Sequence, residues 1–480
     1  MHSPAKRSIS FFIPGVSAAI FHQGVSVMSA IASNPRMKRL AAGLSAAIAL
    51  IGVEAHAFAS VIAVTSCADD NTPGTLRHAV ANAAGGDNIN LSGLSCTDNR
   101  ISLTQGEIVI AQNVTLSGPS GDALTIASGS SGRVLHSTSV DLAVVNLTIS
   151  GGAVHTTDDD ADGGCILAAG NVALVGSTVS NCVASSTNAS AHGGAISALS
   201  VSLVSSRISG SAANSTGSYQ VARGGGVDAT SLSCADSTLS GNSVTAESSG
   251  GYGQGGGALI SDGDVDLSRC TIDSNVAGQG GGIMQFVNRG YSPMTRIQNS
   301  TISGNTATYA SGGVEVFCPD CTPQPVQILN STVAFNSAPS GYGVGICTNG
   351  SVIAQSSIIA NNVAPAGSAY SDLFATDLSG ANNLIVSTNV TPAAGVITVT
   401  SDPLLLPLAD NGGRSWTHRL SASSPARQQG NNAALFNTDQ RGTGFNRMVA
   451  GTVDIGAYQN QLLTIIRARP RPVKGVVGKK

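Results

Sequence analysis

The sequence has few aromatic and few charged residues. Of its 480 residues, 4% are aromatic, with one Trp, and 11% are charged, whereas 58 are Gly and 42% are hydrophobic. So few aromatics exclude a bulky sandwich core, and so much hydrophobic content excludes a disordered chain. Small residues, β-branched residues and frequent glycines instead predict many short strands joined by tight turns.

Long apolar runs are also scarce. The run Leu40–Val53 has 14 residues, which is too short to cross a bilayer, and it follows Lys38 and Arg39 directly. Two Ala-x-Ala cleavage motifs follow, and they end at Ala57 and Ala59. This order of basic, apolar and small residues is typical of a secretory signal peptide.

We therefore predict a signal peptide region at residues 1–59, cleaved after Ala57 or Ala59, with Met37 as the true start of the chain. A membrane anchor extended by the apolar patch Ser8–Phe21 is the alternative.

Negative charge is concentrated in the body of the chain. The whole chain has a net charge of −3. Residues 1–57 contribute +4, and residues 460–480 contribute six basic residues and no acid. The segment between them therefore carries a net charge of −13. An acidic body excludes binding to a nucleic-acid backbone, so no nucleic-acid partner is expected. Residues 461–480 are predicted to be a disordered basic tail, with contact to an anionic surface as the alternative.

All nine cysteines follow the predicted signal, as expected in an oxidising compartment. Because each pair lies within about one repeat length, we expect the disulfides Cys67–Cys96, Cys165–Cys182 and Cys318–Cys321. The last pair could also be a redox motif, but it lacks the helix start that lowers a thiol pKa. The odd number leaves one cysteine free or paired to another molecule.

A repeat of about 30 residues organises the chain. The unit Ser-Thr-x-Ser-Gly-Asn recurs with its second position at Thr115, Thr148, Thr178, Arg207, Thr238, Thr271, Thr301, Thr332 and Ile358. Half a period away, glycines precede an apolar residue at Ile166, Ile196, Val227, Leu259, Ile283, Val314 and Ile346. Two interleaved markers with one period predict a repeat array.

Within a unit, Val265 and Leu267 alternate with polar residues. This alternation of apolar and polar positions then shifts by one residue before Cys270 and Ile272. Since a slip within one strand would turn its core face outward, the chain must bend there. Short strands, bends and constant length predict a parallel β-solenoid of about ten coils, stacked at about 4.8 Å into a rod on the order of 50 Å long.

Asparagines recur four residues after the second repeat position. They are Asn242, Asn275, Asn305, Asn336 and Asn362. Asn tolerates the left-handed conformation, and stacked amides can hydrogen-bond from coil to coil, so we predict a structural ladder at the turn. Five glycan-binding amides are the alternative.

The repeats resemble those of a known group. GGAI at Gly193–Ile196 and STISGN at Ser300–Asn305 are similar to the repeats of polymorphic outer membrane proteins and related pectin-lyase-like proteins. The resemblance implies a right-handed parallel β-helix. Residues 72–87 are similar to the element that precedes such helices, and residues 402–426, 439–442 and 454–459 are similar to the "choice-of-anchor Q" C-terminal region.

One departure from this group stands at Arg427, where its members have an acidic residue after Ser-Pro-Ala. Any property tied to that carboxylate does not carry over.

The segments outside the repeats predict caps. We expect an N-terminal cap and first coils at residues 60–110, repeats at 111–400 and a C-terminal capping region at 401–460. Thr72 and Pro73 open a predicted helix. The apolar face of this helix, formed by Leu76, Ala79, Val80 and Ala83, would cover the first coil.

Carboxylates cluster in TTDDDADGG. Asp158, Asp159, Asp160 and Asp162 are candidate Ca²⁺ ligands, since hard oxygen ligands suit that ion; a solvated loop is the alternative. DGDVD at 262–266 resembles the start of a Ca²⁺-binding loop, but Leu267 holds the required glycine position, so an exposed strand face is favoured.

No catalytic residue or cofactor-binding residue is assigned. His155, His192 and His418 are interpreted as surface histidines. Gly251, Gly253 and Gly256 match G-x-G-x-x-G, but the following segment alternates instead of forming a helix, so these glycines are interpreted as a tight bend.

The favoured function is an exported bacterial surface or extracellular protein, monomeric and adhesive or glycan-binding, whose partners are polysaccharides or cell-surface components. A polysaccharide lyase or glycoside hydrolase is the alternative. Because only about 20 residues follow Gln459, no self-inserted membrane barrel is expected.

Overall fold

The computed structural model describes residues 59–121, 124–129, 132–247, 252–321, 323–339, 343–365 and 371–461. Apart from residues 59 and 461, the predicted signal peptide, with its start at Met37, and the predicted basic tail lie outside these residues. Gly251 of the G-x-G-x-x-G match also lies outside them.

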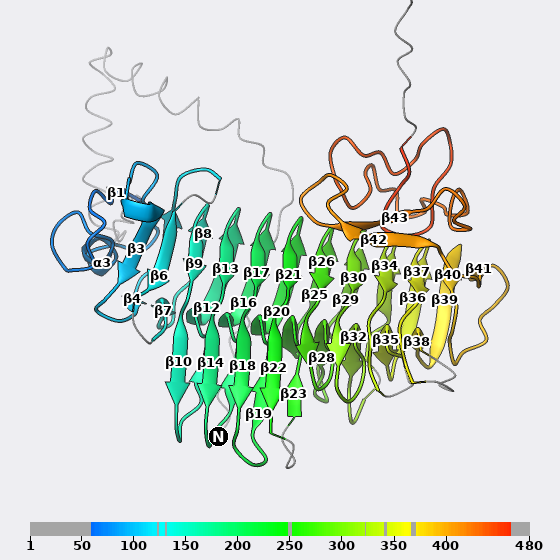
Figure 1. Cartoon of the computed structure of the whole chain (residues 1–480), viewed down its shortest axis with the longest axis horizontal. Helices are drawn as coiled ribbons and strands as arrows, with labels where there is room; N and C mark the ends of the chain where they lie inside the picture. Colours follow the sequence, from blue (N-terminus) through cyan, green and yellow to red (C-terminus); the bar gives the residue numbers. More distant parts are fainter. Residues whose placement is uncertain are drawn as a thin grey trace, which may run out of the picture. The chain divides into compact units, whose positions relative to one another are not determined.

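The described chain folds into a parallel β-helix, and the predicted all-β solenoid of about ten coils is confirmed (Figure 1). Successive coils place their strands side by side in long ladders, and the paired strands are parallel throughout these ladders. The hairpin of β42 (Leu405–Ala409) and β43 (Thr417–Leu420) is antiparallel and lies in the C-terminal segment.

Two ladders run along the molecule. Sheet A contains β1 (Val61–Ala63), β2 (Asn88–Asn90), β4 (Ile108–Ile110), β5 (Val114–Ser117), β7 (Leu135–Ser137), β8 (Leu142–Val145), β12 (Ile166–Val175), β16 (Ile196–Val204), β20 (Val227–Ala235), β24 (Ala258–Ser261), β25 (Val265–Ser268), β28 (Ile283–Phe286), β29 (Thr295–Gln298), β32 (Val314–Phe317), β33 (Val326–Leu329), β35 (Ile346–Thr348), β36 (Ser351–Gln355), β38 (Leu373–Phe374) and β39 (Asp377–Ala381). Sheet B contains β3 (Arg100–Leu103), β6 (Thr125–Ser128), β9 (Thr148–Ser150), β13 (Thr178–Ser180), β17 (Arg207–Ser209), β21 (Thr238–Ser240), β26 (Thr271–Asp273), β30 (Thr301–Ser303), β34 (Thr332–Ala334), β37 (Ile358–Ala360), β40 (Asn383–Ile385) and β41 (Ile397–Val399).

Two shorter ladders lie beside them. Sheet C contains β10 (Ala153–Thr156), β14 (Val183–Ser186), β18 (Ala212–Ser215), β22 (Ser243–Ala246), β27 (Val276–Ala277) and β31 (Thr306–Ala307). Sheet D contains β11 (Ala161–Asp162), β15 (Ala191–His192), β19 (Val221–Arg223) and β23 (Tyr252–Gln254).

The repeat register is confirmed except at two positions. Thr148, Thr178, Arg207 and the later members of the first marker pair from coil to coil in sheet B. Thr115 was assigned wrongly, because it lies in sheet A and Thr125 takes its place beside Thr148. The second-marker position assigned to Leu259 is also wrong by one residue, since Ala258 pairs with both Val227 and Ile283.

Aliphatic side chains from every coil stack inside the helix and form its core. Their branched shapes suit strands that bury one face, and each coil contributes residues that are fully buried. The central column of sheet B runs through Ile126, Ile149, Val179, Ile208, Leu239, Ile272, Ile302, Val333 and Ile359.

The predicted asparagine ladder is present and fully buried along its centre. The amide N–H of Asn242 donates to Oδ1 of Asn275 over 3.0 Å, and the same bond repeats through Asn305, Asn336 and Asn362. The left-handed residue, however, is the one before each asparagine, such as Gly241, Ser274 or Asn361. The asparagine therefore serves the ladder, and its predecessor makes the turn.

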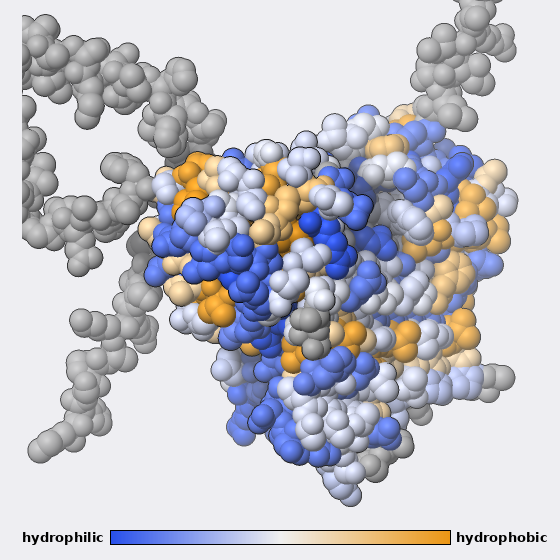
Figure 2. All heavy atoms as spheres, turned by 60° about the vertical axis from the view of Figure 1, so that its left-hand side comes forward, coloured by the Kyte–Doolittle hydropathy of each residue, from blue (hydrophilic) through white to orange (hydrophobic). Residues whose placement is uncertain are grey.

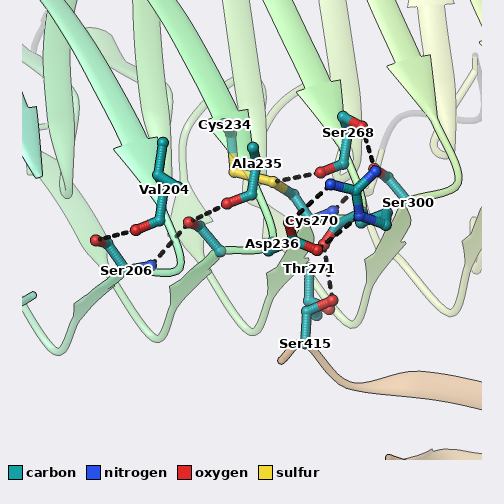
Figure 3. Close-up of a disulfide and its surroundings, with 12 residues drawn as sticks. Val204, Ser206, Cys234, Ala235, Asp236, Ser268, Cys270, Thr271, Ser300 and Ser415 are labelled. Carbon is teal, nitrogen blue, oxygen red and sulfur yellow. Dashed lines mark hydrogen bonds and ion pairs between the residues drawn. A yellow bond between two sulfur atoms is a disulfide. The ribbon is translucent and has the colours of Figure 1, made fainter. Parts of the chain in front are cut away.

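Four disulfides form within the described residues. Cys67–Cys96, Cys165–Cys182 and Cys318–Cys321 are as predicted. Cys234–Cys270 was not predicted; it joins consecutive coils inside the core, with a Cα–Cα distance of 6.3 Å (Figure 3). Cys347 is the remaining free cysteine.

The N-terminal helix is shorter than predicted. Helix α3 (Leu76–Ala81) begins after Thr75, whose side chain accepts a hydrogen bond from the His78 amide, so Thr75 and not Thr72 is the cap. Leu76, Ala79 and Val80 are buried as predicted. A 3₁₀ turn, η2 (Thr97–Asn99), precedes β3.

Sheets C and D form a projecting arm, defined here as strands β10, β14, β18 and β22 with β11, β15, β19 and β23 (Figure 1). Its two layers pack through small side chains, namely Ala161, Ala184, Ala191, Ala213, Ala222 and Val244, and Ala277 of β27 joins this cluster at the end of the arm. Alanines allow the layers to approach closely. The arm is confined to the N-terminal half of the helix because β27 and β31 have two residues each.

The C-terminal segment, residues 402–461, lies along the side of sheet B. Thr271 Oγ1 donates to the Trp416 carbonyl oxygen over 2.6 Å, and the Ala457 amide donates to Thr332 Oγ1 over 3.0 Å. Further on, Leu420 and Ile455 pack with Ile358 in an apolar cluster. We predicted a cap on the end of the helix, but these contacts make the segment a lateral cover.

Among the described residues, no helix is long and apolar enough to span a membrane.

Candidate functional site

The end of the arm creates a step on the surface. Strand β22 has four residues, but only Ser243 has a partner in β27, at Val276. Beyond that pair the coil turns back at Gly278. The rest of β22 and the adjacent strand β23 therefore stand above a shorter coil.

A groove of about 510 Å³ lies at this step. It is lined by Val244, Thr245, Ala246, Tyr252, Gly253, Val276, Gly278, Gln279, Thr308 and Tyr309. The two tyrosines are 55% and 65% exposed. The groove thus combines two accessible rings, aliphatic walls and several polar groups within the size range of ligand sites.

Backbone hydrogen bonds fix the floor of the groove. The Gln279 amide donates to Gly253 over 2.9 Å, and the Tyr309 amide donates to Gly278 over 2.8 Å. A Cβ atom on Gly278 would lie 2.7 Å from the Gly253 oxygen, so this close approach requires glycine. Both rings are consequently carried by backbone that is tied to neighbouring coils.

Tyrosine brings both an apolar ring and a polar hydroxyl to such a site. Thr245, Gln279 and Thr308 add hydrogen-bonding groups. A ligand with flat apolar faces and many hydroxyls, as a sugar chain has, matches this lining. Among the described residues that line the groove, none carries a carboxylate or an imidazole.

A polar row runs along the outer face of the arm. Asp162, His192, Arg223 and Gln254 occupy matching positions in sheet D. His192 Nδ1 lies 3.0 Å from Asp162 Oδ1. Burial lowers the pKa of His192, but the hydrogen bond to Asp162 and the charges of Asp228 and Asp162 outweigh it, so this pKa is raised above its usual value.

The four candidate Ca²⁺ ligands are not brought together. Asp158 accepts a hydrogen bond from the Asn188 amide group, Asp160 accepts one from the Ser190 backbone, and Asp162 pairs with His192. In the described ranges, no group of three or more His, Cys, Asp or Glu could hold a metal ion. Three of these carboxylates, those of Asp158, Asp160 and Asp162, instead link one arm coil to the next.

The acidic stretch at 262–266 also ties coils together. Asp262 accepts hydrogen bonds from the backbone and side chain of Asn288, and Asp264 accepts one from the Met294 amide. The alternating burial of β25 places Asp266 on the outer face of sheet A. The favoured interpretation as a strand face agrees with this geometry.

The three histidines have different environments. His155 is exposed. His418 is buried, contrary to its interpretation as a surface residue; it bonds Ser303 over 2.8 Å, and burial lowers its pKa. His192 is half-buried and paired with Asp162, so it is more than a surface histidine.

Sequence reasoning missed Tyr252 and Tyr309. One signal was available, because the interval between the second markers shortens at Ile283. A shorter coil after long coils implies a step, and aromatics beside it mark a candidate groove. The sequence alone does not show which loops project at the step.

Comparisons with known proteins add little. No family model matches the chain, and no curated protein sequence matches it. Among solved structures, the crystal structure of pectate lyase Pel9A is similar, with 10% sequence identity and a TM-score of 0.47 over 84% of this chain and 96% of that chain. The parallel β-helix is established here from the strand pairing itself.

Proposed function

We propose that this protein is an exported, monomeric β-helix that binds carbohydrate chains at the bacterial surface or outside the cell. The observation that carries the proposal is the groove between Tyr252 and Tyr309 at the end of the arm. Partners are polysaccharides or cell-surface glycans. The groove binds its ligand without cleaving it.

The environment of the chain supports an extracellular site of action. Four disulfides pair eight of the nine cysteines, and such bonds persist in oxidising compartments. The surface around the N-terminal end carries many hydrophilic residues, with hydrophobic ones in separate patches (Figure 2). This face therefore presents no single broad apolar surface.

The test is a binding assay with a panel of immobilised bacterial and plant polysaccharides. We expect the wild type to bind at least one of them. Replacing Tyr252 and Tyr309 by Ala should reduce that binding at least tenfold, since stacking area is lost at both walls of the groove. The matched control is Tyr291→Ala, which removes a tyrosine that is 58% exposed outside the groove.

Two outcomes would contradict the proposal. Equal binding by the wild type and the double tyrosine variant would show that the groove is not the site. Release of unsaturated or reducing ends from a bound polysaccharide would show instead the alternative function, a polysaccharide lyase or glycoside hydrolase. The same preparations, incubated with and without Ca²⁺, give both readouts.

A further inference from the structure

A second cluster of polar side chains lies at the corner where sheet D turns into sheet A. Gly224, Gly225 and Gly226 separate Arg223 at the end of β19 from Val227 at the start of β20. A Cβ atom on Gly224 would lie 2.1 Å from the Val227 oxygen, which shows how sharply the chain bends. The bend brings outward side chains of the two sheets together.

Arg223 has no acceptor in this corner. Its Nε atom is buried and has no hydrogen-bond partner among the described residues. Asp228 and Arg223 interact electrostatically, but they form no ion pair within 4.0 Å. An anionic oxygen from outside the chain would supply an acceptor for this guanidinium group.

The neighbouring groups complete a site for such an oxygen. Asp162 holds Nδ1 of His192 and so orients the ring. Within the described part of the chain, Nε2 of His192 and the carboxyl group of Asp228 take part in no hydrogen bond. His192, Arg223 and Asp228 are each half-buried, so they remain accessible to a ligand.

We propose that Arg223, His192 and Asp228 form a subsite for an anionic oxygen group, a carboxylate or a sulfate ester, on the carbohydrate chain. This inference rests on the proposed function and specifies an acidic glycan. Arg223 is paired with Gln254 and Gln254 with Gln279, which lines the groove. Two strand spacings, roughly 10 Å, separate the backbones of Arg223 and Gln279, so one chain can reach both.

Binding at this subsite depends on pH. Burial raises the pKa of Asp228 to about 6, although His192 and Arg223 oppose the rise, and the pKa of His192 is raised as well. Near pH 5, cationic Arg223 and His192 face one carboxylate, Asp162. As pH rises above about 6, the Asp228 carboxyl group ionises, and the subsite then repels an anion.

The other charged groups near the corner balance one another. Arg133 lies within 2.5 Å of Glu107 and also donates to the backbone oxygen of Asp162. His136 lies 3.0 Å from the same Glu107 carboxylate.

The probes are glucuronate, glucose 6-sulfate and glucose, which differ only at C6. Nuclear magnetic resonance of the isotope-labelled His192 imidazole reports binding to the full-length exported protein. At pH 5 we expect saturable shifts with the two anionic sugars and none with glucose. The apparent affinity should fall at least tenfold by pH 8. Comparing the two anions distinguishes a carboxylate subsite from a sulfate subsite.

Two variants and one control sharpen the test. Arg223→Gln should weaken binding at pH 5 at least tenfold, whereas Asp228→Asn should keep binding at pH 8 within threefold of its pH 5 value. Arg289→Gln removes the same charge from an exposed loop and should bind like the wild type. Equal shifts with glucose, or full binding by Arg223→Gln, would overturn the subsite.

The experiment separates this inference from the proposed function. The subsite is measured with monosaccharides at His192, whereas the proposed function is measured with polymers and tyrosine variants. Polymer binding that needs the tyrosines but not Arg223 would overturn the subsite alone. Glucuronate binding at the corner without polymer binding would overturn the proposed function alone.

Discussion

At the scale of single residues, stacking converts one side chain per coil into a continuous network. Each ladder asparagine accepts a backbone N–H from the coil before it and donates its own side-chain N–H groups to both neighbouring coils. All members from Asn242 to Asn336 are fully buried. Removing one amide therefore leaves buried polar groups unsatisfied on both sides.

Asn336→Ala tests this ladder. The substitution removes the acceptor for the Asn305 amide N–H and side chain. We expect a loss of about 2–4 kcal/mol in the free energy of unfolding, from unsatisfied groups and a cavity. Denaturant unfolding measures the loss, with the exposed Asn188→Ala as control; similar stability of both variants would contradict the ladder's role.

A second residue, Glu315, makes stability depend on pH. Glu315 is 7% exposed, and burial raises its pKa to about 7 although backbone N–H groups of Gly280 and Ser311 oppose the rise. A carboxyl group whose folded pKa exceeds its unfolded value of 4.5 favours folding most below that value. Stability therefore falls as pH rises from about 4.5 to about 7.

Glu315→Gln removes this dependence. We expect the fall in unfolding free energy between pH 4.5 and 8 to be smaller in the variant than in the wild type by about 1–3 kcal/mol. Thermal and urea unfolding across that range give the comparison, and parallel pH profiles for the two proteins would contradict the assignment.

At the scale of elements, the coils are joined by a second ladder, made of serines, and a disulfide interrupts it. Ser177 donates its amide N–H to Ser206 Oγ, and Ser206 donates to Ser237 Oγ. Cys270 then holds the next position and itself donates to Ser300 Oγ over 3.0 Å (Figure 3). The covalent bond to Cys234 replaces one hydroxyl of the ladder.

This replacement predicts a difference between two double variants. Cys234→Ala with Cys270→Ala loses both the disulfide and any acceptor, and should lose about 2–5 kcal/mol. Cys234→Ala with Cys270→Ser restores the hydroxyl and should recover about 1 kcal/mol of that loss. Unfolding in guanidinium chloride measures the stability of both variants. Equal stability would show that the serine ladder does not continue through this coil.

The C-terminal cover depends on a buried arginine. Arg447 is fully buried and donates to the backbone oxygens of Gly456 and Ala457 and to Asn299 Oδ1 of the β-helix. Arg447→Ala leaves these acceptors unsatisfied and opens a cavity. We expect the segment 402–461 to detach locally at a loss of about 3–5 kcal/mol.

Limited proteolysis reports this detachment. Cleavage within residues 402–461 should be at least tenfold faster in Arg447→Ala than in the wild type. The exposed Arg414→Ala is the control and should be cleaved like the wild type. Faster cleavage in the helix coils instead would show that Arg447 supports the whole fold and not the segment.

The repeats predicted the fold well because each coil places the same residue types in the same environment. Thr148, Thr178 and their equivalents could be aligned by spacing alone, and three of the four disulfides followed from sequence distances within one coil. The groove could not be predicted, since Tyr252 and Tyr309 meet only where the arm ends. Arg223 and Asp228 were missed because a three-glycine bend, not a sequence motif, brings them together.

At the scale of the whole molecule, a regular helix supports two irregular additions. The arm projects from the N-terminal half, and the C-terminal segment covers sheet B in the other half (Figure 1). The groove lies where the arm ends, and Arg223 lies where sheet D of the arm turns into sheet A, so the coils beneath hold both in fixed register. We therefore propose that recognition takes place at the arm and that the rest of the helix supports it.

Hydrogen–deuterium exchange with a bound polysaccharide tests whether recognition takes place at the arm. We predict slower exchange in residues 244–247, 252–254, 276–279 and 308–309, with the covered face of sheet B unchanged. Tyr252→Ala with Tyr309→Ala should remove that protection. Protection confined to sheet B or to the C-terminal segment, with exchange in the arm unchanged, would contradict it.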